Sequence, residues 1–412
     1  MKLNDVKDIV NELYLEQVHG STMEEINELS CVDIGKKLES LSNQNNNLYQ
    51  MFIDRVGRYV QKNKIYRAKF KGLIRDSWEW GAIKQTVRVR PFNAMSDPMR
   101  NPVNGQTYLE AFKYHQADVV AKYFSDYDNF QFVWNSENYE TLWTAFNSWD
   151  ELNRFFDGIE MSIVSSKEKR LEALLLNCIN AMTGRIIADA DYHAGDLHDM
   201  GNVSTLKFVN IFKNWNDSHG ANEQFSTVEE ANQSKAYLKY KYLTILNYKD
   251  RFTDLVNLLN IDGEDVFTLK DEINLVLLNT QANNMKVNLE SDTYHNDLVD
   301  LKNIGNYETV SYWQSPGTSY SFNDTSKIKV KVQTADNDTQ GRSVECGGII
   351  GVMFDKAACG VNCERAKTTS QYIAELDRFT YFDKYQAQYF NDFSENFVVF
   401  AEVAPAAETD GN

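Results

Sequence analysis

The sequence has few of the residues that mark linkers, secreted frameworks or membrane spans. Only five of its 412 residues are proline, so we expect one elaborated body rather than domains joined by proline-rich linkers. Its five cysteines are odd in number and scattered, which argues against a secreted disulfide framework and favours folding in a reducing cytoplasm. The N-terminus lacks the apolar core of a secretory signal, and no apolar run approaches the roughly 18–20 residues that span a bilayer. We therefore expect no membrane partner.

Basic residues are also scarce relative to acidic ones. The chain has 42 Lys and Arg against 59 Asp and Glu, which gives a net charge of −17. A chain this acidic repels free nucleic acid as a whole, so we expect no sequence-specific DNA binding. The length is sufficient for two or three ordinary domains and for a sizeable buried core.

The stretch from Cys346 to Val403 organises the rest of the chain. It opens with CGGIIGVMFDKAACGVN and closes with the apolar run FVVFA at 397–401. Apolar blocks this short and this rich in β-branched residues predict strands covered on both faces, at 349–354 and at 397–401. No nucleophile, base and oxyanion donor occur here in workable spacing, so we expect neither an enzyme nor a cofactor.

Three segments of this stretch carry a resemblance to a known family. They are GIIGVMFD at 348–355, TTSQYI at 368–373 and DFSENFVVF at 392–400. Together they resemble the C-terminal end of major capsid proteins from small, short-tailed bacteriophages with the HK97-like shell fold. The resemblance implies an α+β subunit that self-assembles as pentamers and hexamers into the icosahedral shell around a double-stranded DNA genome.

The resemblance also implies an order of domains along the chain. We expect a helical N-terminal arm at 1–62, an extended β-hairpin flap (the E-loop) at 63–118, a peripheral domain with a long spine helix at 119–195 and 346–403, an axial domain at 196–345, and a disordered tail at 404–412.

The implied partners are other copies of the chain, a portal protein and a separate scaffolding protein, because a short arm leaves little room for a fused scaffold. The implied location is the virion shell, assembled in the host bacterial cytoplasm.

Two segments near the N-terminal side alternate with period two. Tyr66, Ala68 and Phe70 alternate with basic residues, and Val87 and Val89 alternate with Arg88 and Arg90. This alternation predicts two strands, which the resemblance would make the E-loop. The aromatic-dense residues 119–134 predict further β-structure.

The predicted flap is basic while the rest of the chain is acidic. Residues 55–90 contain eleven basic and two acidic side chains, a local charge of +9 that leaves −26 elsewhere. Such a flap complements the acidic body of another copy, which favours oriented association. A solvated strand face, or a patch that touches DNA, is the alternative. The candidate inter-subunit contacts are Arg67, Lys69, Lys71, Arg88, Arg90, Trp78 and Trp80.

Helical periodicity is longest in the middle of the chain. An apolar stripe begins at Leu152 after a possible cap at Ser148 or Asp150, breaks at the polar residues 165–166 and resumes from Leu171 to Met182. In the resemblance this is the spine helix. We also predict a helix behind the capping-box pattern at 226–229, a helix from Thr268 through Leu277, and a strand at 327–332.

Two patterns offer metal-binding alternatives. Residues 188–199 hold six side chains of metal-ligand types, namely Asp189, Asp191, His193, Asp196, His198 and Asp199. A metal-dependent hydrolase is therefore the competing enzyme hypothesis, although the spacing of these residues fits neither HEXXH nor an EF-hand loop. Cys346, Cys359 and Cys363 could bind zinc, but no second close pair completes four ligands. A minor head or tail protein of a phage is the third hypothesis.

Overall fold

The computed structural model describes residues 66–70, 72–75, 84–92, 116–135, 149–191, 197–290, 306–311, 313, 328–333, 341–373, 375 and 378–405. The chain divides into two compact units, of which the larger comprises Arg67–Phe132, Lys167–Thr369 and Phe382–Asn412. The smaller comprises Met1–Tyr66, Val133–Ser166 and Ser370–Tyr381. The predicted arm at 1–62 and residues 406–412 of the predicted tail lie outside the described residues.

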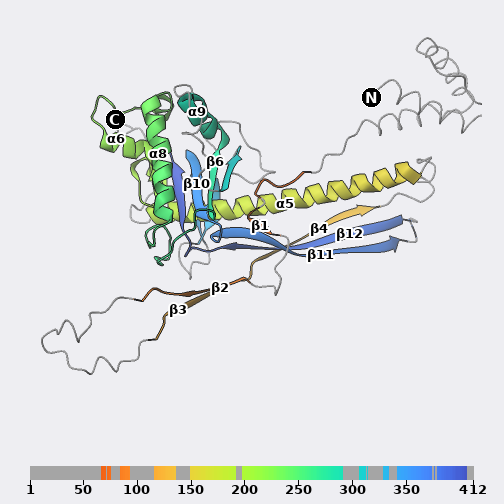
Figure 1. Ribbon diagram of the computed structural model, residues 1–412. Coiled ribbons are helices and arrows are strands. Elements are labelled where there is room, and N and C mark those ends of the chain that lie inside the picture. Colours follow the sequence, from red (N-terminus) through yellow and green to blue (C-terminus); the bar gives the residue numbers. More distant parts are fainter. Residues whose placement is uncertain are drawn as a thin grey trace, which may run out of the picture. The chain divides into compact units, whose positions relative to one another are not determined.

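A five-stranded sheet forms the centre of the larger unit (Figure 1). Its order is β5 (Phe208–Asn210), β13 (Phe397–Ala401), β10 (Ile349–Asp355), β6 (Ile273–Leu278) and β7 (Asn306–Val310). β10 lies antiparallel between β13 and β6, and every residue of these three strands is buried. The two strands predicted at 349–354 and 397–401 are therefore confirmed.

Helices pack on the two faces of this sheet. Successive residues of β13 point to opposite faces: Phe397 and Val399 pack in the cluster that contains Leu175 and Ile179 of α5 (Trp149–Asp191). Val398 and Phe400 pack in the cluster formed with α6 (Ile211–Ser218), α8 (Lys235–Phe252) and α9 (Asn279–Glu290). The core of this unit is thus a mixed sheet with helices on both faces, and the combination of helices and strands confirms the predicted α+β class.

α5 confirms the predicted spine helix, but the predicted break at 165–166 is wrong. The Ser165 hydroxyl donates to the carbonyl oxygen of Met161, at 2.8 Å, so the serine is accommodated by bonding back to the preceding turn. By length and composition the helical stretch Met161–Ala190 could also cross a membrane, yet 83% of its apolar window is buried inside the protein, as in a core helix.

The predicted helix through Leu277 is also wrong, because its apolar residues form β6. INLVLL pairs on one side with β10 and on the other with β7, and both of its faces are buried. Five of the six residues of this run are apolar, so it has no clear period by which a helix and a buried strand can be distinguished. The helix of this region, α9, begins at Asn279, directly after the strand.

A second sheet has the order β1 (Ile74–Arg75), β11 (Cys359–Ile373), β12 (Arg378–Asn391) and β4 (Tyr127–Asn135). With β3 (Val119–Phe124), β4 confirms the β-structure predicted at 119–134. A two-stranded pair of β8 (Ile328–Val332) and β9 (Arg342–Cys346) confirms the strand predicted at 327–332.

The strand predicted around Ala68 is wrong. Residues 66–70 have no strand partner, and the backbone N–H of Ala68 donates to the Glu168 carboxylate of α5 at 3.2 Å. Ala68 and Phe70 are buried while Arg67 and Lys69 are exposed, so the alternation of this segment reflects its burial and not a β-ladder.

The capping-box prediction holds one residue further along. Thr227 caps the short helix α7 (Val228–Ala231) by accepting from Glu230 N–H, and α8 begins separately at Lys235. The helix that we predicted as one is therefore two, with Asn232 and Ser234 between them as caps.

The two predicted domains share one sheet. β10 and β13, which we expected in the peripheral domain, are hydrogen-bonded to β6 and β5, which we expected in the axial domain. The C-terminal strands therefore join the segments that the predicted boundaries at 195 and 346 separate.

Gly348 offers a test of how closely the ends of β10 and β13 meet. Its φ is +72°, and a Cβ there would meet the carbonyl oxygen of Glu402. We expect Gly348→Ala to lower the free energy of unfolding by about 1–3 kcal/mol, measured by urea denaturation. The control is Gly220→Ala, where a Cβ meets open space and the expected change is within about 0.5 kcal/mol. Equal stability of the two variants would contradict this account.

Candidate functional site: the base of the β2–β3 hairpin

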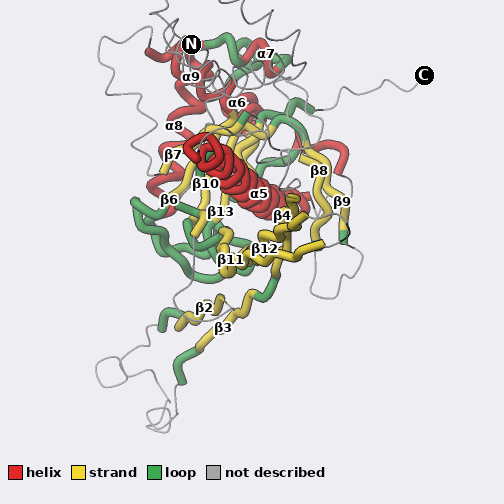
Figure 2. The backbone as a smooth tube through the Cα atoms, turned by 90° about the vertical axis from the view of Figure 1, so that its right-hand side faces the viewer, coloured by secondary structure: helices red, strands yellow, loops and turns green. Residues whose placement is uncertain are grey.

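β2 (Lys84–Val89) pairs with β3 in an antiparallel hairpin that stands apart from the other described strands (Figures 1 and 2). The register runs from Lys84 opposite Phe124 to Val89 opposite Val119. Because side chains alternate along a strand, the hairpin has two distinct faces. The inner face is half-buried and consists of Thr86, Arg88, Val120, Lys122 and Phe124. The outer face is exposed and consists of Gln85, Val87, Val89, Val119, Ala121 and Tyr123.

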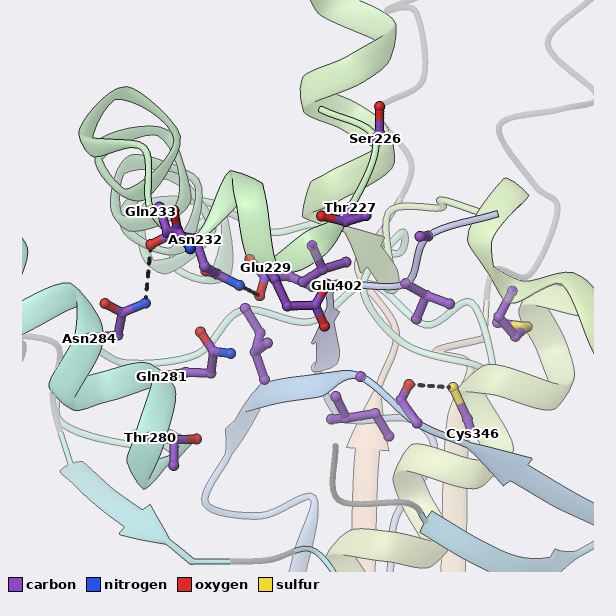
Figure 3. Close-up of a pocket in the computed structure, with 18 of the residues that line it drawn as sticks. Ser226, Thr227, Glu229, Asn232, Gln233, Thr280, Gln281, Asn284, Cys346 and Glu402 are labelled. Atoms are coloured by element: carbon purple, nitrogen blue, oxygen red, sulfur yellow. Dashed lines mark hydrogen bonds between the residues drawn. The ribbon is translucent and has the colours of Figure 1, made fainter. Parts of the chain in front are cut away.

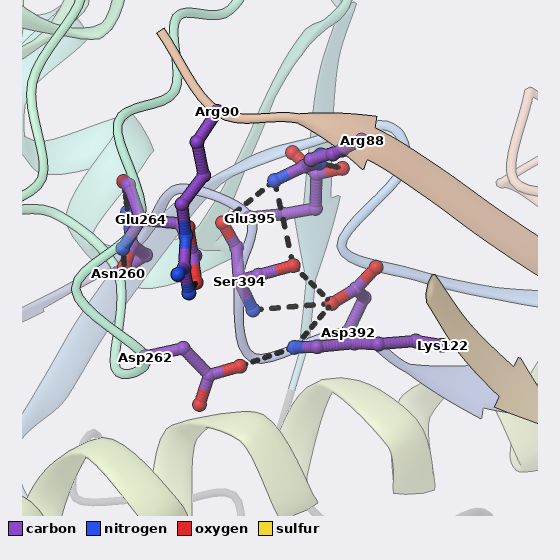
Figure 4. Close-up of polar contacts among 9 residues, drawn as sticks. All are labelled: Arg88, Arg90, Lys122, Asn260, Asp262, Glu264, Asp392, Ser394 and Glu395. Carbon is purple, nitrogen blue, oxygen red and sulfur yellow. Dashed lines mark hydrogen bonds and ion pairs between the residues drawn. The ribbon is translucent and has the colours of Figure 1, made fainter. Parts of the chain in front are cut away.

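Arg88 attaches the first strand of the hairpin to the polar turn at 392–396 (Figure 4). Its guanidinium donates to the Ser394 carbonyl oxygen at 3.2 Å and forms an ion pair with the Glu395 carboxylate. The Glu395 side chain is 6% exposed, so this carboxylate is almost removed from water and depends on Arg88 for its charge compensation.

Lys122 attaches the second strand to the same turn. Its ammonium group pairs with Asp262 and lies 3.4 Å from Asp392 (Figure 4). The Asp392 side chain is fully buried, and its Oδ1 also accepts from the N–H of Ser394 at 3.1 Å and from the hydroxyl of Ser394 at 2.6 Å. Both strands of the hairpin are therefore held by carboxylates of one buried turn.

The turn is itself fixed by backbone hydrogen bonds to three other segments. Asp392 N–H donates to Ala358 O at 2.7 Å, and Asp355 N–H donates to Asn396 O at 3.0 Å. The carbonyl oxygen of Phe393 accepts from Ile261 N–H at 3.0 Å. The turn thus fixes the base of the hairpin relative to the central sheet.

Arg90 adds an exposed pair of contacts at the end of β2. It binds Glu264 with two nitrogens and lies 2.6 Å from Asp118. These hydrogen bonds raise the pKa of Arg90, and the same contact with Arg90 holds the pKa of Glu264 below its ordinary value of 4.5. The Arg90 side chain is 47% exposed, so we assign this contact to orientation of the strand.

The seven predicted contact residues have different surroundings in the structure. Arg88 and Arg90 have carboxylate partners within their own chain, which the sequence-based prediction did not consider. Arg67 and Lys69 are exposed, while Lys71, Trp78 and Trp80 lie outside the described residues. Inter-subunit contacts of these residues stay predictions.

Sequence reasoning missed the remaining residues of the site, Lys122, Asp262, Glu264, Asp392 and Glu395. The signal for Asp392 and Glu395 is present in the DFSEN part of the 392–400 motif, where two carboxylates lie just before a buried strand. A charge in such a place needs a partner, and the basic residues of β2 and β3 supply it.

A polar pocket lies between α7, α9 and the start of β10 (Figure 3). One of its carboxylates, Glu402, already accepts from the Tyr237 hydroxyl at 2.7 Å and pairs with Lys241, whose side chain is fully buried. Burial lowers the pKa of Lys241, and the neighbouring Glu402 opposes that change. Asn232 and Gln281 accept from the same ammonium group, so we interpret this network as an attachment of the chain segment after β13 to the helices.

No metal centre occurs among the residues that the structure describes, since these contain no group of three or more His, Cys, Asp or Glu that could hold an ion. Asp189 pairs with Lys207, while His193 and Asp196 fall outside the described residues. Cys346, Cys359 and Cys363 are buried, and burial raises the pKa of the Cys346 thiol to about 12, which disfavours the thiolate that zinc requires.

Removing Arg88 tests the attachment of the hairpin. Arg88→Ala leaves the Glu395 carboxylate buried and unpaired, so we expect the free energy of unfolding to fall by about 2–3 kcal/mol in urea denaturation. Adding Glu395→Gln should restore part of this loss, since no charge is then stranded. The control is Lys329→Ala, which breaks an exposed pair with Glu345 and should cost about 0–1 kcal/mol. Similar losses in the two single variants would refute the assignment.

Comparisons with known proteins identify the family. The model of the Phi29-like phage major capsid protein family matches residues 6–401, whereas no curated protein sequence matches the chain. One similar solved structure is the capsid of Staphylococcus phage Andhra, with a TM-score of 0.51, 9% identity and coverage of 83% of this chain and 86% of that chain.

A second similar structure is that of the head fiber and inner core protein gp22 of native bacteriophage P68. It has a TM-score of 0.51 and 10% identity, and the match covers 84% of this chain and 87% of that chain. At such identities these structures show the fold alone, which is HK97-like. Because the family model spans nearly the whole sequence, the chain belongs to the Phi29-like phage major capsid protein family and is a structural subunit of the virion shell.

Proposed function

We propose that the chain builds its shell as pentamers and hexamers in which the hairpin of each subunit packs on another copy. The observation that carries this proposal is the apolar outer face of the hairpin. Val87, Val89, Val119 and Tyr123 are 56%, 57%, 53% and 66% exposed. Antiparallel strands ordinarily turn their apolar face to the core and their polar face to water. This hairpin instead exposes three valines and a tyrosine, while Arg88 and Lys122 lie on its half-buried face.

The inner-face ion pairs supply the reason for this arrangement. They direct Arg88 and Lys122 toward the chain's own carboxylates, which leaves Val87, Val89 and Val119 on the opposite side. An exposed apolar patch of this kind marks a protein interaction site, and in a shell the available partner is a second copy.

Family membership supports the other features of the proposal. We propose a structural protein without catalysis or cofactor, which encloses double-stranded DNA without sequence-specific contact and assembles in the host cytoplasm with separate scaffolding and portal proteins. The family supports this proposal over the metal-dependent hydrolase and the minor head or tail protein.

The outer face can be tested by adding charge to it. We expect Val87→Lys with Val89→Lys to abolish closed shells, because the lysines would have to be desolvated at the contact. Negative-stain microscopy and light scattering would be applied to the chain alone and with candidate scaffolding proteins from the same genome. The control is Val287→Lys on α9, which replaces a valine that is also exposed, by 67%, but lies outside the hairpin. Shells formed as readily by the double variant as by the control would contradict the proposal, provided circular dichroism shows both folded.

We propose that the exposed basic side chains of Arg67 and Lys69 form ion pairs with carboxylates of an adjacent copy. Charge reversal of both to Glu should lower shell yield at low salt, and the deficit should shrink near 1 M salt, where the Debye length is about 3 Å. The matched control reverses two other exposed lysines, Lys239 and Lys331. Unchanged yield of the Arg67 and Lys69 variant at low salt would eliminate this contact.

A further inference from the structure

We infer that the outer face of the hairpin docks on an acceptor patch formed by Leu255, Phe267 and Leu269 of a second copy. The inference rests on the proposed function and names the surface that receives the hairpin. The patch lies in the segment between α8 and β6. Its three side chains are 55%, 53% and 52% exposed.

The backbone brings the patch together. Val256 and Val266 form an antiparallel bridge with reciprocal hydrogen bonds, each 3.1 Å long. Leu255 precedes one member of this pair and Phe267 follows the other, which places them opposite each other on the same side of the bridge. Val266 is buried on the other side, and Leu269 is two residues beyond Phe267. The segment therefore presents Leu255 and Phe267 to water while Val266 turns inward.

The two exposed surfaces fit a head-to-tail contact. The hairpin face and the acceptor patch are different parts of the larger unit, so a contact between them is heterologous and can close into rings of identical subunits. A surface that pairs only with itself would give isolated dimers, which do not close a shell.

Charge and hydrogen bonding also agree with this pairing. The exposed carboxylates of Asp254, Asp265 and Asp271 flank the patch, whereas the outer face of the hairpin carries no charged residue, so no like charges oppose each other. The two polar side chains of that face are hydrogen-bonded to each other, since Gln85 Nε2 donates to the Tyr123 hydroxyl at 3.1 Å. The tyrosine ring can be covered without stranding its hydroxyl.

The acceptor segment also orients the subunit's own hairpin. Asp262 and Glu264, between the two halves of the patch, bind Lys122 and Arg90 of the same chain. One short segment therefore fixes the direction of the outgoing hairpin and, by this inference, receives the incoming one. A shift of this segment would move both contacts of a subunit together.

Disulfide cross-linking between two kinds of chain tests the inference. Both kinds carry Cys31→Ser, because the other four cysteines are buried. One chain carries Val87→Cys, and the other, enlarged by a tag, carries Phe267→Cys. After co-assembly and mild oxidation, we expect a mixed dimer on a non-reducing gel, since a disulfide needs Cα atoms within about 7 Å. Replacing Phe267→Cys by Val287→Cys should abolish that dimer.

The outcomes separate the inference from the proposed function. Shells without the mixed dimer, or with an equal dimer to Val287→Cys, would overturn the acceptor patch and leave the role of the hairpin standing. If the cysteine chains alone form no shells, both are mixed as minor components with wild-type chains. The cross-linked peptide is then sought by mass spectrometry, and its absence again overturns the acceptor patch. Normal shells from the Val87→Lys and Val89→Lys chain would defeat both proposals.

Discussion

The hairpin depends on the compensation of two buried carboxylates. Asp392 and Glu395 lie in one turn whose backbone is bound to β10 and to the loop before β6, and their charges are met by Lys122 and Arg88 from the two strands of the hairpin. Leaving either carboxylate buried without its cation is costly, so the hairpin cannot swing away from the turn without a loss of stability. The orientation of its apolar outer face is a consequence of this electrostatic requirement.

Much of the architecture could be predicted from the sequence, where local pattern and burial agree. β10 and β13 were found as short apolar blocks, and the apolar stripe of α5 has a clear helical period. The errors lie where one pattern serves two structures. β6 is apolar at five of its six positions and so has no clear period, and the alternation at 66–70 comes from burial in a segment without a strand partner.

The candidate site was only partly accessible to the same reasoning. The basic character of β2 was evident, but the partners of Arg88 lie 306 and 307 residues away, and nothing local reveals which carboxylates a strand will meet. The alternation of valine and arginine was recognised, yet it gives no sign of which set faces the body. The register of β2 with β3 and the buried turn together decide that question in favour of the arginine.

The exposed apolar face of the hairpin also affects how subunits interact before they assemble. Attraction between exposed valines acts at contact and changes little with salt, whereas repulsion between chains of net charge −17 extends over about 10 Å at 0.1 M ionic strength. Unassembled copies are therefore held apart by a long-range barrier that surrounds a short-range attraction. Such a balance keeps the subunits dispersed at low concentration and makes the start of a shell, rather than its growth, the slow event.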